Sequence, residues 1–118
     1  MKIVFIYDNS NEMYKKLVNG ITESLESSES KENVVISNKF SPRSKCDIYV
    51  VVSDNILEIK KYSEKILDKN RILILTENLA SSHVINCIEI TPNVCYMKND
   101  INVISKKICA IFSSEKTI

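Results

Sequence analysis

Apolar residues along the chain follow two alternating spacings. Short unbroken apolar runs are typical of strands covered on both faces of a sheet. Between them, apolar residues recur every three or four positions, as they do on one face of a helix. The runs predict strands over residues 3–7, 34–36, 48–52, 71–76 and 94–97. Because strand and helix patterns alternate along the chain, we expect a three-layer α/β domain with a parallel sheet.

Helical patterns follow most of these strands. The first starts after candidate N-caps at residues 9–11, and the second follows Asp54 and Asn55. Ser81 or Ser82 is expected to cap the third, and the last follows Asp100 and is expected to end at Phe112. The stretch 37–45 holds little apolar material and contains a proline, so the second crossover is expected to lack a full helix. The residues expected to face the core share the helical spacing: Met13, Leu17, Val18, Ile21, Leu25, Ile56, Ile59, Ile66, Leu67, Val84, Ile85, Ile88, Ile101, Ile104, Ile108 and Ile111.

Length and charge narrow the class of protein. A chain of 118 residues with 44% apolar side chains fits one domain, which we place at 1–113, followed by a polar tail at 114–118. Sixteen basic and fifteen acidic side chains give a formal charge of +1, which favours neither nucleic acid nor an anionic membrane as partner. The first apolar run is too short for a signal peptide or a membrane span, so we expect a cytoplasmic protein.

Glycine and cysteine usage excludes several kinds of site. The single glycine, Gly20, lies inside the first predicted helix, so no glycine-rich phosphate loop can form. The four cysteines, Cys46, Cys87, Cys95 and Cys109, form no C-x-x-C pair. We therefore expect reduced cysteines in the core, and neither a dinucleotide nor a zinc site.

Four polar residues stand where predicted strands end: Asp8, Asp54, Thr76 and Lys98. Parallel strands bring their C-terminal ends to one edge of the sheet, where α/β folds place their sites. With the segments 74–76 and 96–100, this arrangement resembles the receiver domains of response regulators. The resemblance implies a flavodoxin/CheY-like fold: a five-stranded parallel sheet in the order 2-1-3-4-5 with four or five helices.

The same resemblance implies roles for these residues. Asp54 would accept a phosphoryl group, Asp8 and Asp54 would bind Mg²⁺, and Thr76 and Lys98 would respond to the phosphoryl group. The chain departs from the receiver pattern at Asn9, where a second acidic residue is usual, and at Val52, which occupies the usual acceptor position. The resemblance is thus to a degenerate, or pseudo-, receiver with lost or atypical aspartyl phosphorylation, and Mg²⁺ is needed only if phosphorylation survives. Such a domain signals through a protein partner, either a kinase or downstream regulator or a second copy, and is not expected to be an enzyme.

Other interpretations remain open. The segments 5–8 and 46–55 are similar to strands of TIR domains, in which Glu58 or Glu64 would be the candidate NAD-cleaving carboxylate. Asp54 is also placed to act as a simple N-cap, and His83 is expected on a helix surface. A phosphocysteine carrier is disfavoured, because no cysteine follows the first strand directly.

Overall fold

The computed structural model describes residues 2–27, 35–37 and 46–116. Residues 38–45, which carry most of the predicted helix-free crossover, lie outside this range. None of the described helices is long and apolar enough to cross a membrane. The elements, in chain order, are β1 (Lys2–Ile6), α1 (Glu12–Ser27), β2 (Val35–Ser37), β3 (Ile48–Val52), α2 (Ile56–Ser63), the 3₁₀ turn η1 (Lys69–Arg71), β4 (Ile72–Thr76), α3 (Ser81–Ile90), β5 (Val94–Tyr96) and α4 (Ile101–Lys116).

The strands pair in parallel in the order β2-β1-β3-β4-β5. Phe5 of β1 is paired with Val50 of β3, and Val51 of β3 is paired with Ile74 of β4. Every residue of β3 and β4 is buried, which is why these strands read as unbroken apolar runs. The prediction of an α/β domain with a parallel sheet is confirmed.

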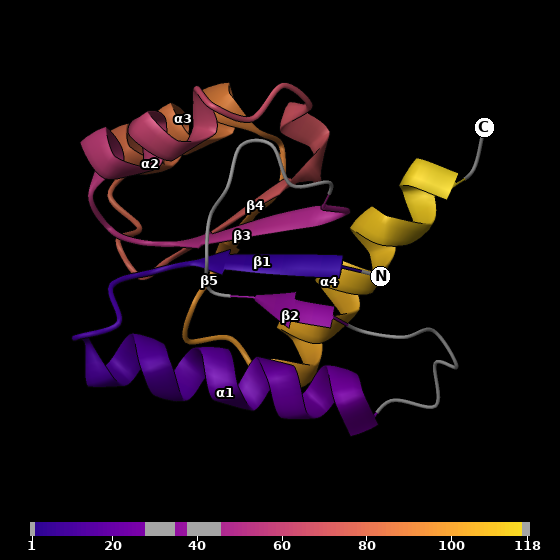
Figure 1. Cartoon of the computed structure of the whole chain (residues 1–118). Helices are drawn as coiled ribbons and strands as arrows, with labels where there is room; N and C mark the ends of the chain where they lie inside the picture. Colours follow the sequence, from indigo (N-terminus) through magenta and orange to yellow (C-terminus); the bar gives the residue numbers. More distant parts are fainter. Residues whose placement is uncertain (1, 28–34, 38–45, 117–118) are drawn as a thin grey trace.

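Two apolar layers lie on opposite faces of the sheet, because successive side chains of a strand point to opposite sides. Phe5 and Val50 belong to the core beneath α1 and α4. Val4 and Val51 belong to the core beneath α2 and α3. Figure 1 shows α2 and α3 together on one side of the strands and α1 on the other. The molecule therefore has three layers, helix, sheet and helix.

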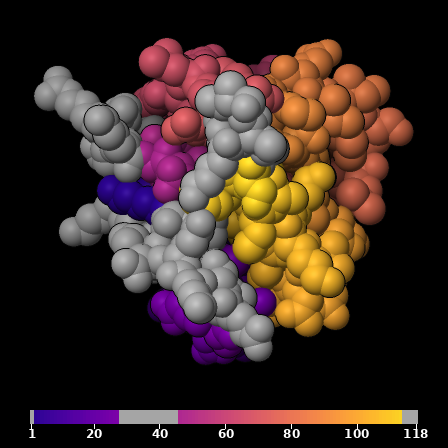
Figure 2. Space-filling model, turned by 90° about the vertical axis from the view of Figure 1, so that its right-hand side faces the viewer, coloured from indigo at the N-terminus to yellow at the C-terminus, as the bar shows by residue number. Residues whose placement is uncertain are grey.

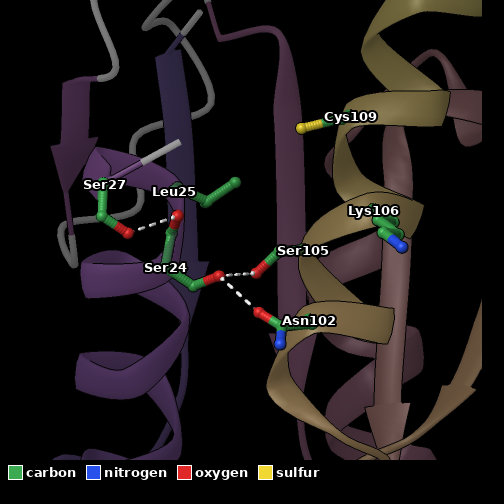
Figure 3. Close-up of a pocket in the computed structure, with 7 residues that line it drawn as sticks. All are labelled: Ser24, Leu25, Ser27, Asn102, Ser105, Lys106 and Cys109. Atoms are coloured by element: carbon green, nitrogen blue, oxygen red, sulfur yellow. Dashed lines mark hydrogen bonds between the residues drawn. The ribbon is translucent and has the colours of Figure 1, made fainter. Parts of the chain in front are cut away.

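The contact between α1 and α4 is close. An added Cβ on Gly20 would lie 2.5 Å from Cδ1 of Ile101, so glycine lets α1 approach the first turn of α4. Further along, the Ser105 hydroxyl donates to Oγ of Ser24 at 3.0 Å (Figure 3). In Figure 2 the yellow residues of α4 lie between the purple residues of α1 and the orange residues above them.

Several helical predictions are wrong in detail. Leu67 is 99% exposed because α2 ends at Ser63, and Ile85 and Ile88 are 56% and 54% exposed because α3 turns His83 and Cys87 inward instead. Met13, also expected in the core, is exposed at the start of α1.

Two helix ends also differ from the prediction. Ala80, not a serine, occupies the N-cap position of α3, and no side chain caps that helix. At the other end of the chain, α4 continues to Lys116, because no glycine or proline follows Phe112 to stop it.

Candidate functional site

The C-terminal edge of the sheet carries the candidate site. Asp8 follows β1, Asp54 follows β3, Thr76 ends β4 and Lys98 follows β5. A hollow of about 480 Å³ opens at this edge between the start of α1 and the start of α2. Its lining consists of polar and acidic residues with one aromatic ring: Asp8, Asn11, Tyr14, Ser53, Asp54, Asn55 and Glu58.

Asp54 accepts three hydrogen bonds on one carboxylate oxygen. Its Oδ1 accepts hydrogen bonds from the Thr76 hydroxyl at 2.5 Å, from the Glu77 N–H at 2.8 Å and from the Asn78 N–H at 3.1 Å. All three donors belong to the end of β4 and the loop that follows. We call this set of three hydrogen bonds the Asp54 latch, because it ties the β3–α2 turn to the β4–α3 loop.

Asp54 does not cap α2. The N-cap is Asn55, whose Oδ1 accepts from the N–H groups of Leu57 at 3.0 Å and Glu58 at 3.3 Å. The interpretation of Asp54 as a plain N-cap is therefore wrong. Because its neighbour satisfies the helix end, the Asp54 side chain is available to reach across to β4.

The hydrogen bonds of Asp54 outweigh its partial burial. Burial alone would raise the carboxyl pKa, but the Thr76 hydroxyl and the N–H groups of Glu77 and Asn78 favour the charged form, and His83 adds a smaller favourable charge effect. The pKa of Asp54 is accordingly lower than its usual value.

Behind the latch, a short polar chain runs into the core. Thr76 is fully buried, and its Oγ1 lies 2.9 Å from Nε2 of His83, which is only 7% exposed. Since the Thr76 hydroxyl gives its single proton to Asp54, Nε2 of His83 must be the donor to Oγ1. Nε2 also lies 3.6 Å from Sγ of Cys87, one helical turn further along α3.

The expectation that His83 lies on a helix surface is therefore wrong. Its signal in the sequence is the spacing of four residues to Cys87, which puts both side chains on one face of α3. A buried hydroxyl at the end of β4 gives the imidazole its partner.

Asp8 is held by its own loop. Its Oδ1 accepts from the hydroxyl and the N–H of Ser10, at 2.6 and 2.9 Å, and these bonds lower its pKa although the carboxylate is fully exposed. Asp8 and Asp54 line the same hollow but have separate hydrogen-bond partners. Across the described residues, no group of three histidine, cysteine, aspartate or glutamate side chains is placed to hold a metal ion.

Lys98 joins the site indirectly. Its ammonium lies 3.6 Å from the carboxylate of Glu77, and the side chain is 61% exposed. Glu77 donates its backbone N–H to Asp54, so it stands between the lysine and the latch. The structure thus brings Asp54 and Thr76 into direct contact and leaves Lys98 at the rim.

Two further residues shape the electrostatics of the hollow. Partial burial, together with the charges of Asp54 and Glu77, raises the pKa of Tyr14, so its phenol stays protonated at neutral pH. Glu58 also faces the hollow, where the Ser53 hydroxyl lies 3.4 Å from its Oε2. Glu64, the other candidate of the TIR-like interpretation, is exposed at the end of α2.

A second hollow of about 500 Å³ lies between α1 and α4 (Figure 3). The polar side chains in it bond largely to each other: Ser105 to Ser24, and Ser24 to Asn102 at 3.5 Å. These contacts hold the two helices together, and no acid, base or nucleophile pair is assembled there among the described residues.

Comparison with known proteins adds no family. The chain matches no protein-family model, and no curated protein is significantly similar to it.

Proposed function

We propose that the chain is a receiver-like regulatory domain that acts through protein contacts in one latched state, without switching by aspartyl phosphorylation. As part of this proposal, the domain has a flavodoxin/CheY-like fold, with a five-stranded sheet in the order 2-1-3-4-5. It acts in the cytoplasm, and its partner is a downstream regulator or a second copy of the chain.

The observation that carries the proposal is the Asp54 latch. A phospho-acceptor carboxylate needs an oxygen free to attack and a metal ion to neutralise the developing charge. Here three hydrogen bonds to Oδ1 of Asp54 hold the carboxylate against the end of β4 and stabilise its negative charge. A carboxylate whose charge is stabilised in this way is a weaker nucleophile, although its Oδ2 carries none of these bonds.

Thr76 supports the same interpretation. In a switching receiver the hydroxyl at this position moves inward when the phosphoryl group appears. Thr76 is already fully buried, with its hydroxyl bonded to the carboxylate itself and to His83. The domain therefore has its inward arrangement without a phosphoryl group, and phosphorylation has no remaining movement to drive.

The test is beryllofluoride, a phosphoryl mimic, added with Mg²⁺ while amide resonances are followed by NMR. We expect the resonances of Asp54, Glu77, Asn78 and Lys98 to stay in place at saturating mimic. The Asp54→Asn variant serves as the matched control, since it keeps the shape of the side chain. Saturable shifts in the natural sequence that vanish in this variant would overturn the proposal and restore a phosphorylation switch.

The TIR-like alternative has one structural point in its favour, which is that Glu58 lines the hollow. A NAD-consumption assay separates the two functions. We expect no consumption above a buffer blank; consumption that is lost in Glu58→Gln and kept in Glu64→Gln would instead establish an NAD-cleaving enzyme.

A further inference from the structure

The hollow between α1 and α4 has the size of a ligand site. The two helices approach closely at Gly20 and Ile101, and beyond that contact a space of about 500 Å³ opens between them (Figure 3). Side chains of both helices line this space. Pockets for small molecules are typically of this volume.

Small side chains keep the hollow open. Around it the cores of the two helices are closely packed, since Ile21 of α1 and Ile104 and Ile108 of α4 are completely buried. Ser24 and Ser105 take the positions between the helices, and Ser105 is only 7% exposed. A leucine at either position would bury more apolar surface and fill the space. The two serines therefore give up packing and leave room for another molecule.

The polar groups of the hollow offer hydrogen-bond donors. The Ser105 hydroxyl donates to Oγ of Ser24 at 3.0 Å, and the Ser24 hydroxyl is directed at Oδ1 of Asn102, 3.5 Å away. With its oxygen turned to Ser24, Asn102 keeps both protons of Nδ2, and no described residue accepts them. The ammonium of Lys106 likewise has no hydrogen-bond or ion-pair partner in the described part of the chain.

The charge of the lining favours an anion. Among the described residues that line the hollow, Lys106 is the one charged side chain, and no carboxylate stands beside it. A phosphate is usually held by backbone N–H groups at the start of a helix. Here the N–H of Asn102 already donates to the Asp100 carboxylate at 2.9 Å, and those of Val103 and Ile104 donate to the Asp100 C=O. One ammonium and one amide group suit a singly charged carboxylate better than a phosphate.

The rest of the lining is largely apolar. Leu25 is 2% exposed and points from α1 towards α4, while Cys109, one turn beyond Ser105, points from α4 towards α1 (Figure 3). A short hydrocarbon chain would lie between these two side chains. The hollow therefore combines donors for an anion with an apolar wall.

From these observations we infer that the hollow between α1 and α4 binds a small organic carboxylate with a short hydrocarbon chain. The carboxylate accepts from Lys106 and from Nδ2 of Asn102, and the chain lies against Leu25 and Cys109. Such a ligand contacts both helices, so its binding stabilises the folded chain. The hollow shares no lining residue with the one at Asp54, and the inference goes beyond the proposed function.

The experiment is an NMR titration of the whole chain with hexanoate, and with hexanamide as an uncharged ligand of nearly the same shape. We expect hexanoate to give saturable amide shifts at Ser24, Asn102, Ser105 and Cys109, with a dissociation constant on the order of 1 mM. Hexanamide should bind at least about threefold more weakly, because it lacks the charge that pairs with Lys106.

Lys106→Met and Lys107→Met form a matched pair of variants. Both lysines are exposed on α4, so effects on folding should be alike, but only Lys106 lines the hollow. Lys106→Met should raise the dissociation constant of hexanoate about three- to fivefold, the scale of one exposed ion pair, and Lys107→Met should leave it unchanged.

Several results would overturn the inference. These are the absence of saturable shifts at about twenty times the expected dissociation constant, shifts confined to another part of the chain, equal affinity for hexanamide, or equal effects of the two lysine variants. None of them bears on whether beryllofluoride binds at Asp54, so the two proposals fail separately.

Discussion

The Thr76 hydroxyl lies 2.5 Å from Oδ1 of Asp54 and 2.9 Å from Nε2 of His83. One buried hydroxyl thus connects a loop carboxylate on one side to an imidazole in the core on the other. The stability of this edge of the sheet depends on the latch, and four predictions follow from it and from the helix contact on the opposite face.

Removing the carboxylate should cost more at Asp54 than at Asp8. Asp54→Ala deletes the acceptor of three hydrogen bonds, and we expect the free energy of unfolding to fall by about 1–3 kcal/mol. Asp8→Ala removes an exposed carboxylate bonded only within its own turn and should leave the free energy of unfolding nearly unchanged. Urea denaturation of both variants measures the difference. Equal losses would show that the latch adds nothing to stability.

The latch should also make stability depend on pH. The pKa of Asp54 is lower in the folded chain than its usual value of 3.8, so the folded state binds this proton less readily than the unfolded state. The stabilisation is therefore fully present above the usual carboxyl pKa and is lost as pH falls through the folded pKa. We expect the stability gap between the natural sequence and Asp54→Asn to stay constant from neutral pH down to about 5 and to narrow below about 4. A gap that widens on acidification would contradict this.

Thr76→Val keeps the shape of the side chain but removes the hydroxyl. Asp54 loses one donor and Nε2 of His83 loses its acceptor, so we expect a loss of about 1–3 kcal/mol in the free energy of unfolding. Thr76→Ser keeps the hydroxyl and serves as control. Imidazole nitrogen shifts of His83 should change in the valine variant and stay close to the natural values in the serine variant. If serine changes them equally, packing and not the hydrogen bond positions the imidazole.

Gly20 and Ile101 should show energetic coupling. Alanine is better than glycine inside a helix by about 0.5–1 kcal/mol, but a Cβ at Gly20 would meet Cδ1 of Ile101. Ile101→Val removes that atom, and the next nearest, Cγ1, is at an ordinary 3.7 Å. We expect Gly20→Ala to raise the free energy of unfolding of the Ile101→Val variant by about 0.5–1 kcal/mol and to raise that of the natural sequence by less. A double-mutant cycle measures the difference. Additive effects would mean that the Ile101 side chain changes its conformation at no energetic cost.

The α/β class follows from the sequence because strands buried on both faces need apolar residues at every position. The run Ile48 to Val52 has that composition, and every one of its residues is buried. Helix faces were harder to predict, since an isoleucine fits equally well in the core or on an exposed flank. Ile85 and Ile88 have helical spacing, but the buried direction of α3 is set by the bond between His83 and Thr76, a contact that no local pattern contains.

The site was predictable in its position and not in its bonding. Strand ends located Asp54 and Thr76 at one edge, and the structure places them in direct contact. That Asn55, and not Asp54, caps α2 depends on which of two adjacent side chains turns back to the helix. Both residue types are good caps, so the sequence leaves the choice open.

The Asp54 latch joins positions that are 22 to 24 residues apart and encloses the whole of α2 and β4. Bringing residues so far apart in the sequence together costs loop-closure entropy, so the latch is expected to form only after β3 and β4 have paired. Once formed, it holds the β3–α2 turn in place and so reduces fraying of the first turn of α2. The segment from β3 to the start of α3 should then open as one cooperative unit, and slow-exchanging amides should extend from the sheet into the first turn of α2.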